Sequence, residues 1–294
     1  MGLGINMIKF IVCSDSDIPR EHIEKYDIDM LPLIVELDNV AYRAYRDITG
    51  DSFRRLLQKS KSFPKTATVS IMEIADKMRA HIENDDEIIM VTMSGKGSGT
   101  FNSAQIAKAQ LEDELGRTLP ISVVDSTTFS IAYLHPVYDA VEMAKYCHSR
   151  QEIVDFLNTA YAKQQIVIIM ADLAYLRRGG RINYSSSVIG GVLGIVSILG
   201  VHDGMLEPIG KERGMTRAID SILRIMEERC PSKKLRRVQL VHWNREEESK
   251  RIESLMKSRF TVEEFLPAVN PEASVTAHAG VDFLGISFTE ASEM

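Results

Sequence analysis

Short apolar segments alternate along this chain with longer segments in which apolar residues recur about every 3.6 positions. The short segments predict β-strands over Ile8–Cys13, Leu31–Leu37, Ile88–Met93, Ile121–Val124, Gln165–Met170, Val196–Val201, Arg237–Trp243, Thr261–Phe265 and Phe283–Phe288. The longer segments predict helices over Asp51–Ser60, Ser70–Asn84, Phe101–Leu115, Ser130–His148, Gln151–Lys163, Met215–Arg229 and Glu246–Ser258. This alternation is typical of an α/β architecture, with helices flanking a mainly parallel sheet in at least the first half.

The length of the chain favours two domains over one, because 294 residues exceed the usual size of a single domain. No flexible linker or internal repeat is visible, so the junction must be short. We expect it near Lys163–Gln165, before a strand that opens a second α/β pattern. The predicted domains are therefore residues 1–163 and residues 164–294.

The composition of the chain indicates which kinds of binding partner to expect. The net charge of −6 argues against nucleic acid as the main partner. No apolar run is long enough to predict a membrane span, so we expect no stable membrane insertion. The first residues lack the pattern of a secretory signal, and we expect a cytoplasmic protein. Cys13, Cys147 and Cys230 are too widely spaced for a metal cluster, so neither a metal nor a cofactor is predicted.

The most informative motif is the glycine-rich run Gly95–Thr100, which follows a predicted strand and precedes a predicted helix. Such a loop directs backbone N–H groups and hydroxyls toward the positive end of the helix dipole, where an anion binds. The glycine spacing matches neither the phosphate loop of nucleotide hydrolases nor the dinucleotide-binding pattern. A simple glycine-rich turn with an ordinary helix cap remains the alternative.

Further polar groups stand in two other segments. Asp172–Ile182 carries three arginines beside the glycine pair Gly179–Gly180, which predicts a short helix with a left-handed cap. One guanidinium of this segment suits a carboxylate or phosphate, while solvated arginines are the alternative. The hydroxyls of Thr66 and Thr68 lie on one short loop, and His278 precedes the last strand. The chain shows no evident pairing of a base with a nucleophile.

These motifs, in this order, resemble the DegV family from about residue 8 to residue 288. The motifs that carry the resemblance are Asp15–Ser16, Pro32–Leu33, Lys65–Thr66, Ser98–Gly99–Thr100, Asp125–Ser126, Tyr175–Ile182, Lys211–Gly214 and His278–Ala279–Gly280. The resemblance implies two α/β domains that hold a long-chain fatty acid between them. It also implies a carrier role, in which a separate kinase subunit phosphorylates the bound carboxylate.

The resemblance assigns roles to particular residues. It implies that Thr66 and Ser98, with Gly99 and Thr100, hold the carboxylate, and that Arg181 and His278 complete the polar end. We expect Arg177 or Arg178 to meet the kinase subunit, because three arginines on one short turn cannot all reach one carboxylate. The charge-free stretch from Val188 to Leu199 is interpreted either as a buried helix leading into a strand or as the wall of an apolar cavity. On the second interpretation, the acyl tail is lined by Val188, Ile189, Leu193 and Ile195.

The chain departs from the family pattern at Ala67, Thr68, Ala132, Leu134, Val281 and Asp282. These departures bear on acyl-chain preference and on contact with a kinase subunit. Two functions are weighed: a non-enzymatic fatty-acid carrier, and a stand-alone enzyme acting on a phosphorylated small molecule or nucleotide through the glycine-rich loop. The missing nucleotide motif favours the carrier.

Overall fold

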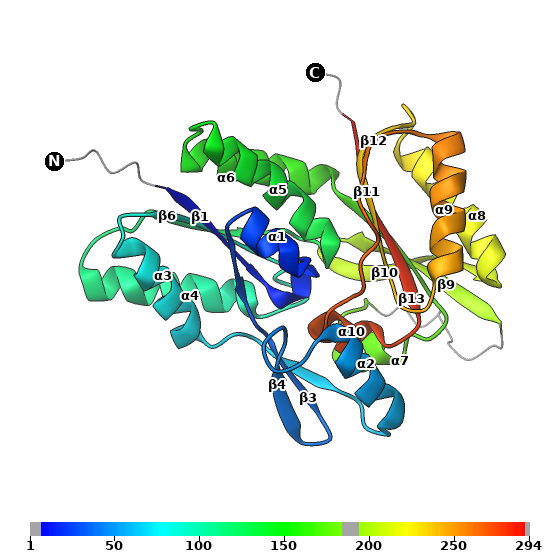
Figure 1. The fold of residues 1–294 in the computed structure, drawn as a ribbon, viewed down its shortest axis with the longest axis horizontal. Helices are drawn as coiled ribbons and strands as arrows, with labels where there is room; N and C mark the ends of the chain where they lie inside the picture. The colour runs from blue at the N-terminus through cyan, green and yellow to red at the C-terminus, as the bar shows by residue number, and fades with distance from the viewer. Residues whose placement is uncertain (1–6, 184–193, 292–294) are drawn as a thin grey trace. The chain divides into compact units, whose positions relative to one another are not determined.

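The computed structural model describes residues 7–183 and 194–291, and its chain forms two compact units (Figure 1). The first unit runs to Ile34 and from Thr66 to Ala162, and the second comprises Val35–Lys65 together with the chain from Lys163 onward. The segment Val35–Lys65 thus groups with the second unit, whereas the sequence analysis assigned it to the first domain.

The first unit is built on a four-stranded parallel sheet in the order β2-β1-β6-β7. Its strands are β1 (Ile8–Cys13), β2 (Ile28–Leu31), β6 (Glu87–Thr92) and β7 (Ile121–Asp125), and the short helices η1 (Ser14–Ser16) and α1 (Arg20–Lys25) follow β1. Helices α3 (Ile71–Ile82) and α4 (Thr100–Leu115) cover one face, while α5 (Ile131–Lys145) and α6 (Arg150–Lys163) lie on the other side (Figure 1). The predicted parallel sheet flanked by helices is confirmed.

The alternation of side chains along the strands explains these layers, because successive residues point to opposite faces. Ile11 and Cys13 of β1 pack with α3 and α4 in one apolar cluster, together with Met90 of β6. On the other side, the Cys13 amide donates to the Tyr133 hydroxyl of α5 at 3.3 Å. Both faces of the sheet are therefore covered, as is usual for a parallel sheet.

The predicted strand Leu31–Leu37 is wrong as a single element. It divides into β2, which ends at Leu31, and β3 (Ile34–Leu37), which belongs to a different sheet. Pro32 stands at the break, and proline has no N–H group to continue a strand ladder. The following amide, that of Leu33, donates instead to the Ser14 hydroxyl at 3.0 Å.

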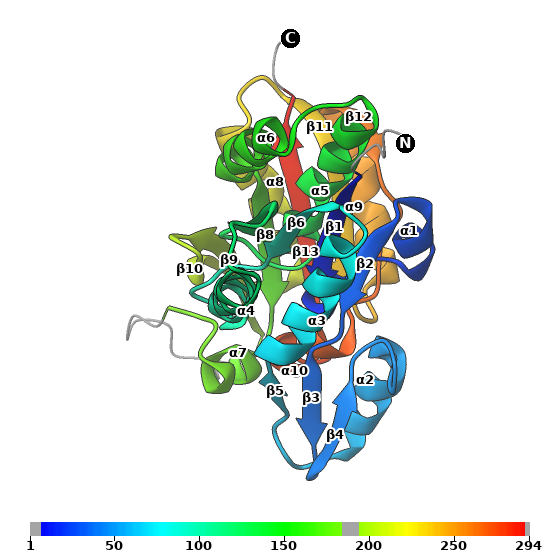
Figure 2. The ribbon, with the colours of Figure 1, turned by 90° about the vertical axis from the view of Figure 1, so that its left-hand side faces the viewer.

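A small three-stranded sheet, in the order β4-β3-β5, follows this break and includes β4 (Val40–Arg43) and β5 (Lys65–Ala67). Helix α2 (Gly50–Lys59) lies beside it (Figures 1 and 2). Phe53 and Leu57 of α2 pack against Ala273 and Ala277 of α10 (Ala273–Ala279), far away in the sequence. This contact explains why Val35–Lys65 groups with the second unit.

The second unit is built on a six-stranded sheet in the order β10-β9-β8-β13-β11-β12. Its strands are β8 (Gln165–Met170), β9 (Ile195–His202), β10 (Met205–Arg213), β11 (Lys234–His242), β12 (Thr261–Phe265) and β13 (Phe283–Glu290). Neighbouring strands run antiparallel except for β11 and β12, so this sheet is mixed.

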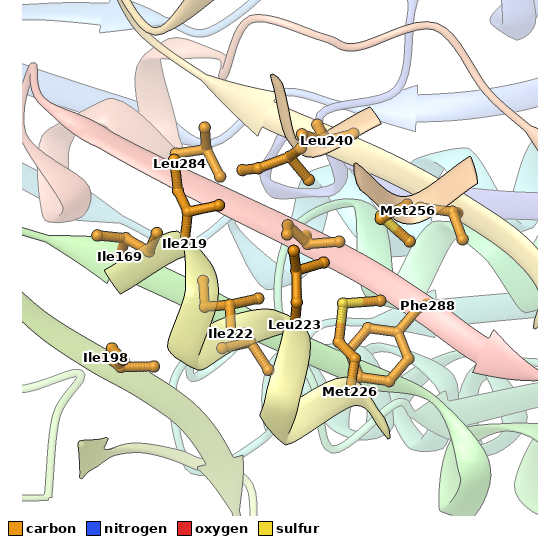
Figure 3. Packing of buried hydrophobic residues seen from close by; sticks show 14 of the residues in the cluster. Ile169, Ile198, Ile219, Ile222, Leu223, Met226, Leu240, Met256, Leu284 and Phe288 are labelled. Carbon is orange, nitrogen blue, oxygen red and sulfur yellow. The ribbon is translucent and has the colours of Figure 1, made fainter. Parts of the chain in front are cut away.

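Helices α8 (Met215–Arg229) and α9 (Glu246–Arg259) bury their apolar stripes in the main core of this unit. Figure 3 shows the cluster, in which Ile222, Leu223 and Met226 of α8 lie close to Leu284 and Phe288 of β13. Burying one such side chain contributes about 1.5–3 kcal/mol to folding. Within the described residues, no helix is both long and apolar enough to cross a bilayer.

We predict that Leu223→Ala lowers the free energy of unfolding of the second unit by about 2–5 kcal/mol, because it leaves a cavity in this core. Trp243, the one tryptophan of the chain, is buried in the second unit, so its fluorescence in a urea titration measures the change. The matched control is Leu56→Ala in the same unit, whose side chain is 40% exposed. An equal effect of both substitutions would contradict the assignment of Leu223 to the core.

Candidate functional site

The glycine-rich loop connects β6 to α4 in the first unit and is held by its own hydrogen bonds. The amides of Gly97 and Ser98 both donate to the Ser94 carbonyl at 2.9 Å. The Gly95 amide donates to the Asp125 carboxylate at 3.1 Å, and the Lys96 amide to the Ser94 hydroxyl at 3.3 Å. These four amides thus stabilise the loop itself.

Two hydroxyls remain together at the end of this loop. The oxygens of Ser98 and Thr100 lie 2.9 Å apart, and the Thr100 amide donates to the Ser98 hydroxyl at 3.3 Å. Both side chains are buried. Gly99, between them, is the exposed N-cap of α4, and no side chain caps this helix start. The positive end of the α4 dipole thus stands beside a pair of hydroxyl groups, an arrangement that suits an anion.

The segment with the predicted Thr66 reaches this loop within the same unit. A Cβ placed on Gly99 would lie 3.5 Å from the methyl group of Thr68, so the two segments are in contact. Thr66 is half-buried in β5, two residues before Thr68. Ser70, just beyond, caps α3 by accepting from the Glu73 amide at 3.1 Å.

Acidic groups at the same edge of the sheet serve the fold. The Tyr133 hydroxyl donates to Asp15 at 2.7 Å, and the Ser130 hydroxyl donates to Asp17. Ser16 closes its own turn by donating to the Cys13 carbonyl at 2.7 Å. These contacts favour a structural role for the Asp15–Asp17 run over ligand binding.

Arg181 and His278 come together in the second unit, through the packing of α7 (Ala174–Gly179) on α10. A Cβ on Gly179 would overlap the His278 ring, and a Cβ on Gly280 would lie 2.8 Å from Tyr175. Both glycines are therefore needed for this close approach. The Arg181 guanidinium donates to the Gly179 carbonyl and so lies beside the same residue. The left-handed cap predicted after this helix is confirmed at Gly180, where φ is +70°.

This arrangement keeps His278 uncharged. Burial, and secondarily the nearby charge of Arg181, lower the pKa of His278 from 6.5 to about 3. A neutral imidazole at neutral pH carries one donor and one acceptor nitrogen. The charge of the Arg181–His278 pair is thus that of Arg181 alone.

The other two arginines of this segment are exposed. The Arg178 guanidinium lies 3.8 Å from the centre of the Phe63 ring, which in turn packs against Tyr175. Arg177 lies beside it on the surface of α7. Arg178 thus lies on the Phe63 ring, whereas Arg181 lies near His278.

The predicted acyl-tail residues Val188, Ile189 and Leu193 lie outside the described residues. Ile195 is described: it is the first residue of β9, half-buried and paired with Arg213 of β10. The predicted carboxylate-binding residues are divided between the two units. The first unit contains Thr66, Ser98, Gly99 and Thr100, and the second unit contains Arg181 and His278.

The departures from the family pattern have structural roles. Ala132 and Leu134 are fully buried in α5. Asp282 accepts two hydrogen bonds from the Arg245 guanidinium, at 2.7 and 2.8 Å. Val281 packs against the cluster formed by α2 and α10. Across residues 7–183 and 194–291, no group of three or more His, Cys, Asp or Glu side chains is placed to hold a metal ion.

Comparison with known proteins gives a consistent result. The family model for the DegV family, described as uncharacterised proteins, matches residues 7–291. A DegV domain-containing protein of Caldanaerobacter subterraneus is 31% identical over 283 residues, which cover 96% of this chain and 99% of that protein. A fatty acid-binding protein of Thermotoga maritima is 28% identical over 286 residues, with 95% and 96% covered.

Solved structures agree with this match. A DegV lipid binding protein from Thermotoga maritima has a TM-score of 0.87 at 26% identity, covering 98% of this chain and all 100% of that one. DegV from Bacillus subtilis, a fatty acid binding protein, has a TM-score of 0.84 at 28% identity, with 97% and 100% covered. The fold is therefore that of an α/β protein with one parallel and one mixed sheet. The chain belongs to the DegV family.

The low pKa of His278 predicts a pH dependence of stability. The unfolded state takes up a proton near pH 6.5 and the folded state only near pH 3, so the free energy of unfolding falls as the pH drops between these values. His278→Gln should make this fall less steep between about pH 7 and pH 5. Urea titrations followed by Trp243 fluorescence measure it. His202→Gln is the control, because the His202 side chain is 77% exposed. Equal slopes for the two variants would contradict the prediction.

Proposed function

We propose that this protein binds a long-chain fatty acid and holds its carboxylate at the start of α4, through Thr66, Ser98, Gly99 and Thr100. The observation that carries the proposal is the pair of buried hydroxyls, with 2.9 Å between the Ser98 and Thr100 oxygens, at an uncapped helix N-terminus. The fatty acid-binding relatives from Thermotoga maritima and Bacillus subtilis support it.

The energetics of a carboxylate explain why such a cluster is needed. A carboxylate that leaves water loses several kcal/mol unless donors and positive charge replace its hydration. The two hydroxyls and the helix dipole supply donors and partial charge, and we propose that Arg181 and His278 also take part. Each buried methylene contributes about 0.8 kcal/mol, so a tail of about 16 carbons offsets the cost of association.

The role of carrier follows from this proposal. We infer that the protein presents its fatty acid to a separate kinase subunit and performs no catalysis itself. Arg177 and Arg178 are the proposed contact residues, since both are exposed on α7, four and three residues before Arg181. That the ligand lies between two domains, lined in part by Ile195, stays a prediction.

Native mass spectrometry of the freshly purified protein tests the ligand class. Retained fatty acid would support the proposal, and a bound nucleotide would favour the alternative of a stand-alone enzyme. We then expect Ser98→Ala to weaken palmitate binding by about 1.5–3 kcal/mol, the contribution of a hydrogen bond to a charged group. Isothermal titration calorimetry measures the change.

Ser103→Ala is the matched control, because Ser103 lies one turn further along α4. It should leave palmitate affinity unchanged. If the double variant Thr66→Ala/Ser98→Ala bound palmitate as tightly as the parent, the carboxylate site would be wrongly placed.

The carrier role predicts a separation between binding and transfer. Arg177→Glu/Arg178→Glu should slow acyl-phosphate formation by a cognate kinase while palmitate affinity is retained, because exposed charges act mainly on association. Arg181→Ala should weaken palmitate binding itself. Lys234→Glu/Lys250→Glu makes the same change in net charge at two other exposed positions and should not slow transfer. Loss of palmitate binding in the arginine reversal, with Arg181→Ala unaffected, would show that the roles are exchanged.

A further inference from the structure

The second unit contains a cavity of about 400 Å³ beside the C-terminal end of α8. Its volume falls within the range of small-molecule sites. None of its lining residues belongs to the Arg181–His278 cluster. The lining consists of Lys163, Gln165, Arg229, Cys230, Glu290 and Ala291.

Arg229 is held in one orientation at this cavity. Its Nη1 donates to the Gln165 side-chain oxygen at 2.8 Å. Its Nη2 lies 3.3 Å from the point where a Cβ on Gly200 would stand, so the guanidinium lies close against the backbone of β9. Gly200 pairs with Val167, two residues after Gln165 on the neighbouring strand β8. The planar fork is therefore positioned by two adjacent strands before any ligand arrives.

Arg229 forms no ion pair within the described part of the chain, although the charge of the neighbouring Glu228 acts on it. Its side-chain hydrogen bond goes to a neutral amide, although the guanidinium is half-buried. Burial lowers the pKa of Arg229, which is the sign of a cation whose hydration is incompletely replaced. Arg224, one turn earlier on the same helix, instead lies 3.7 Å from Glu212.

The remaining charges of the lining do not cancel this cation. Glu290 accepts hydrogen bonds at one oxygen, Oε1, from the amide and hydroxyl of Ser232, at 3.3 and 2.6 Å, so this oxygen is turned to Ser232 and not to Arg229. Burial raises the pKa of the Cys230 thiol to about 11, and the thiol is therefore neutral near pH 7. Lys163 adds a second positive charge to the lining.

We infer that this cavity binds the carboxylate or phosphate group of a small anionic molecule, with Arg229 as its main contact. A guanidinium fork recognises such groups through two parallel hydrogen bonds. Gln165 positions the fork, and Lys163 strengthens the attraction. The site is separate from the proposed fatty-acid site, and its existence does not depend on fatty-acid binding.

Calorimetric titration of the full-length protein with inorganic phosphate, and separately with succinate, tests the inference at constant ionic strength. We expect one of the two probes to bind at one site per chain, and the probe that binds identifies the group as phosphate or carboxylate. Arg229→Gln should weaken that binding at least tenfold, on the order of one lost hydrogen bond to a charged group. Arg224→Gln, on the same helix, is the matched control and should leave it unchanged.

Two further variants make the result decisive. Lys163→Gln changes an exposed side chain and should weaken binding severalfold, so it gives an answer even if Arg229→Gln fails to fold. Ser98→Ala should leave phosphate and succinate binding unchanged, because Ser98 belongs to the proposed fatty-acid site. Absence of binding by both probes, or binding that survives Arg229→Gln or Lys163→Gln at full strength, would overturn the inference. Loss of binding in Ser98→Ala would overturn it too, since the probe would then occupy the fatty-acid site.

Discussion

The start of α4 depends on one constraint: buried backbone groups at the end of a strand must find hydrogen-bond partners. The loop that follows β7 supplies them to the loop that follows β6. The Ser94 amide donates to the Thr128 carbonyl at 2.9 Å, and the Ser126 amide to the Thr92 carbonyl at 3.1 Å. Because β6 and β7 are parallel neighbours, both loops emerge at the same edge of the sheet. The location of the Ser98 hydroxyl is thus a consequence of strand pairing.

In both units, a side chain also has to lie close against the backbone, and a glycine makes room for it. In the first unit, a Cβ on Gly97 would lie 2.6 Å from the Phe129 ring, so this position admits no larger residue without movement. In the second unit, Gly179 lets the His278 ring lie on the end of α7. Glycine here serves packing rather than flexibility, and the contact at Gly179 places the His278 side chain that the proposed function uses.

Three sites in the second unit treat charge in different ways. Asp282 and Arg245 satisfy each other in a two-point contact, which removes both from any binding role. His278 stays neutral beside Arg181, which leaves a single positive charge there. Arg229 keeps its charge beside a cavity with a neutral amide as its partner. A half-buried cation without an ion-pair partner, such as Arg229, is costly, which is why it points to a ligand.

Much of the secondary structure follows from periodicity, because a strand or helix that packs on a core must repeat its apolar residues with its own period. The sequence analysis did not predict two β-hairpins, although the residues of their turns indicate them. Asp38–Asn39 and Asp203–Gly204 occupy the left-handed region, with φ of 51° and 63° in the first pair and 47° and 72° in the second. Such pairs are typical of tight hairpin turns, and they precede β4 and β10.

The sequence by itself determined three strands of the parallel sheet, β1, β6 and β7, but not β2. It also determined the helices with long apolar stripes, the glycine cap after α7 and the motif order of the DegV family. Tertiary structure alone decided three other features: the antiparallel pairing of the second sheet, the grouping of residues 35–65 with α10, and the contact of Gly179 with His278. The physical reason is the distance along the sequence over which each feature is determined. Periodicity and turn preference are set by neighbouring residues, whereas Gly179 and His278 meet only after the chain between them has folded.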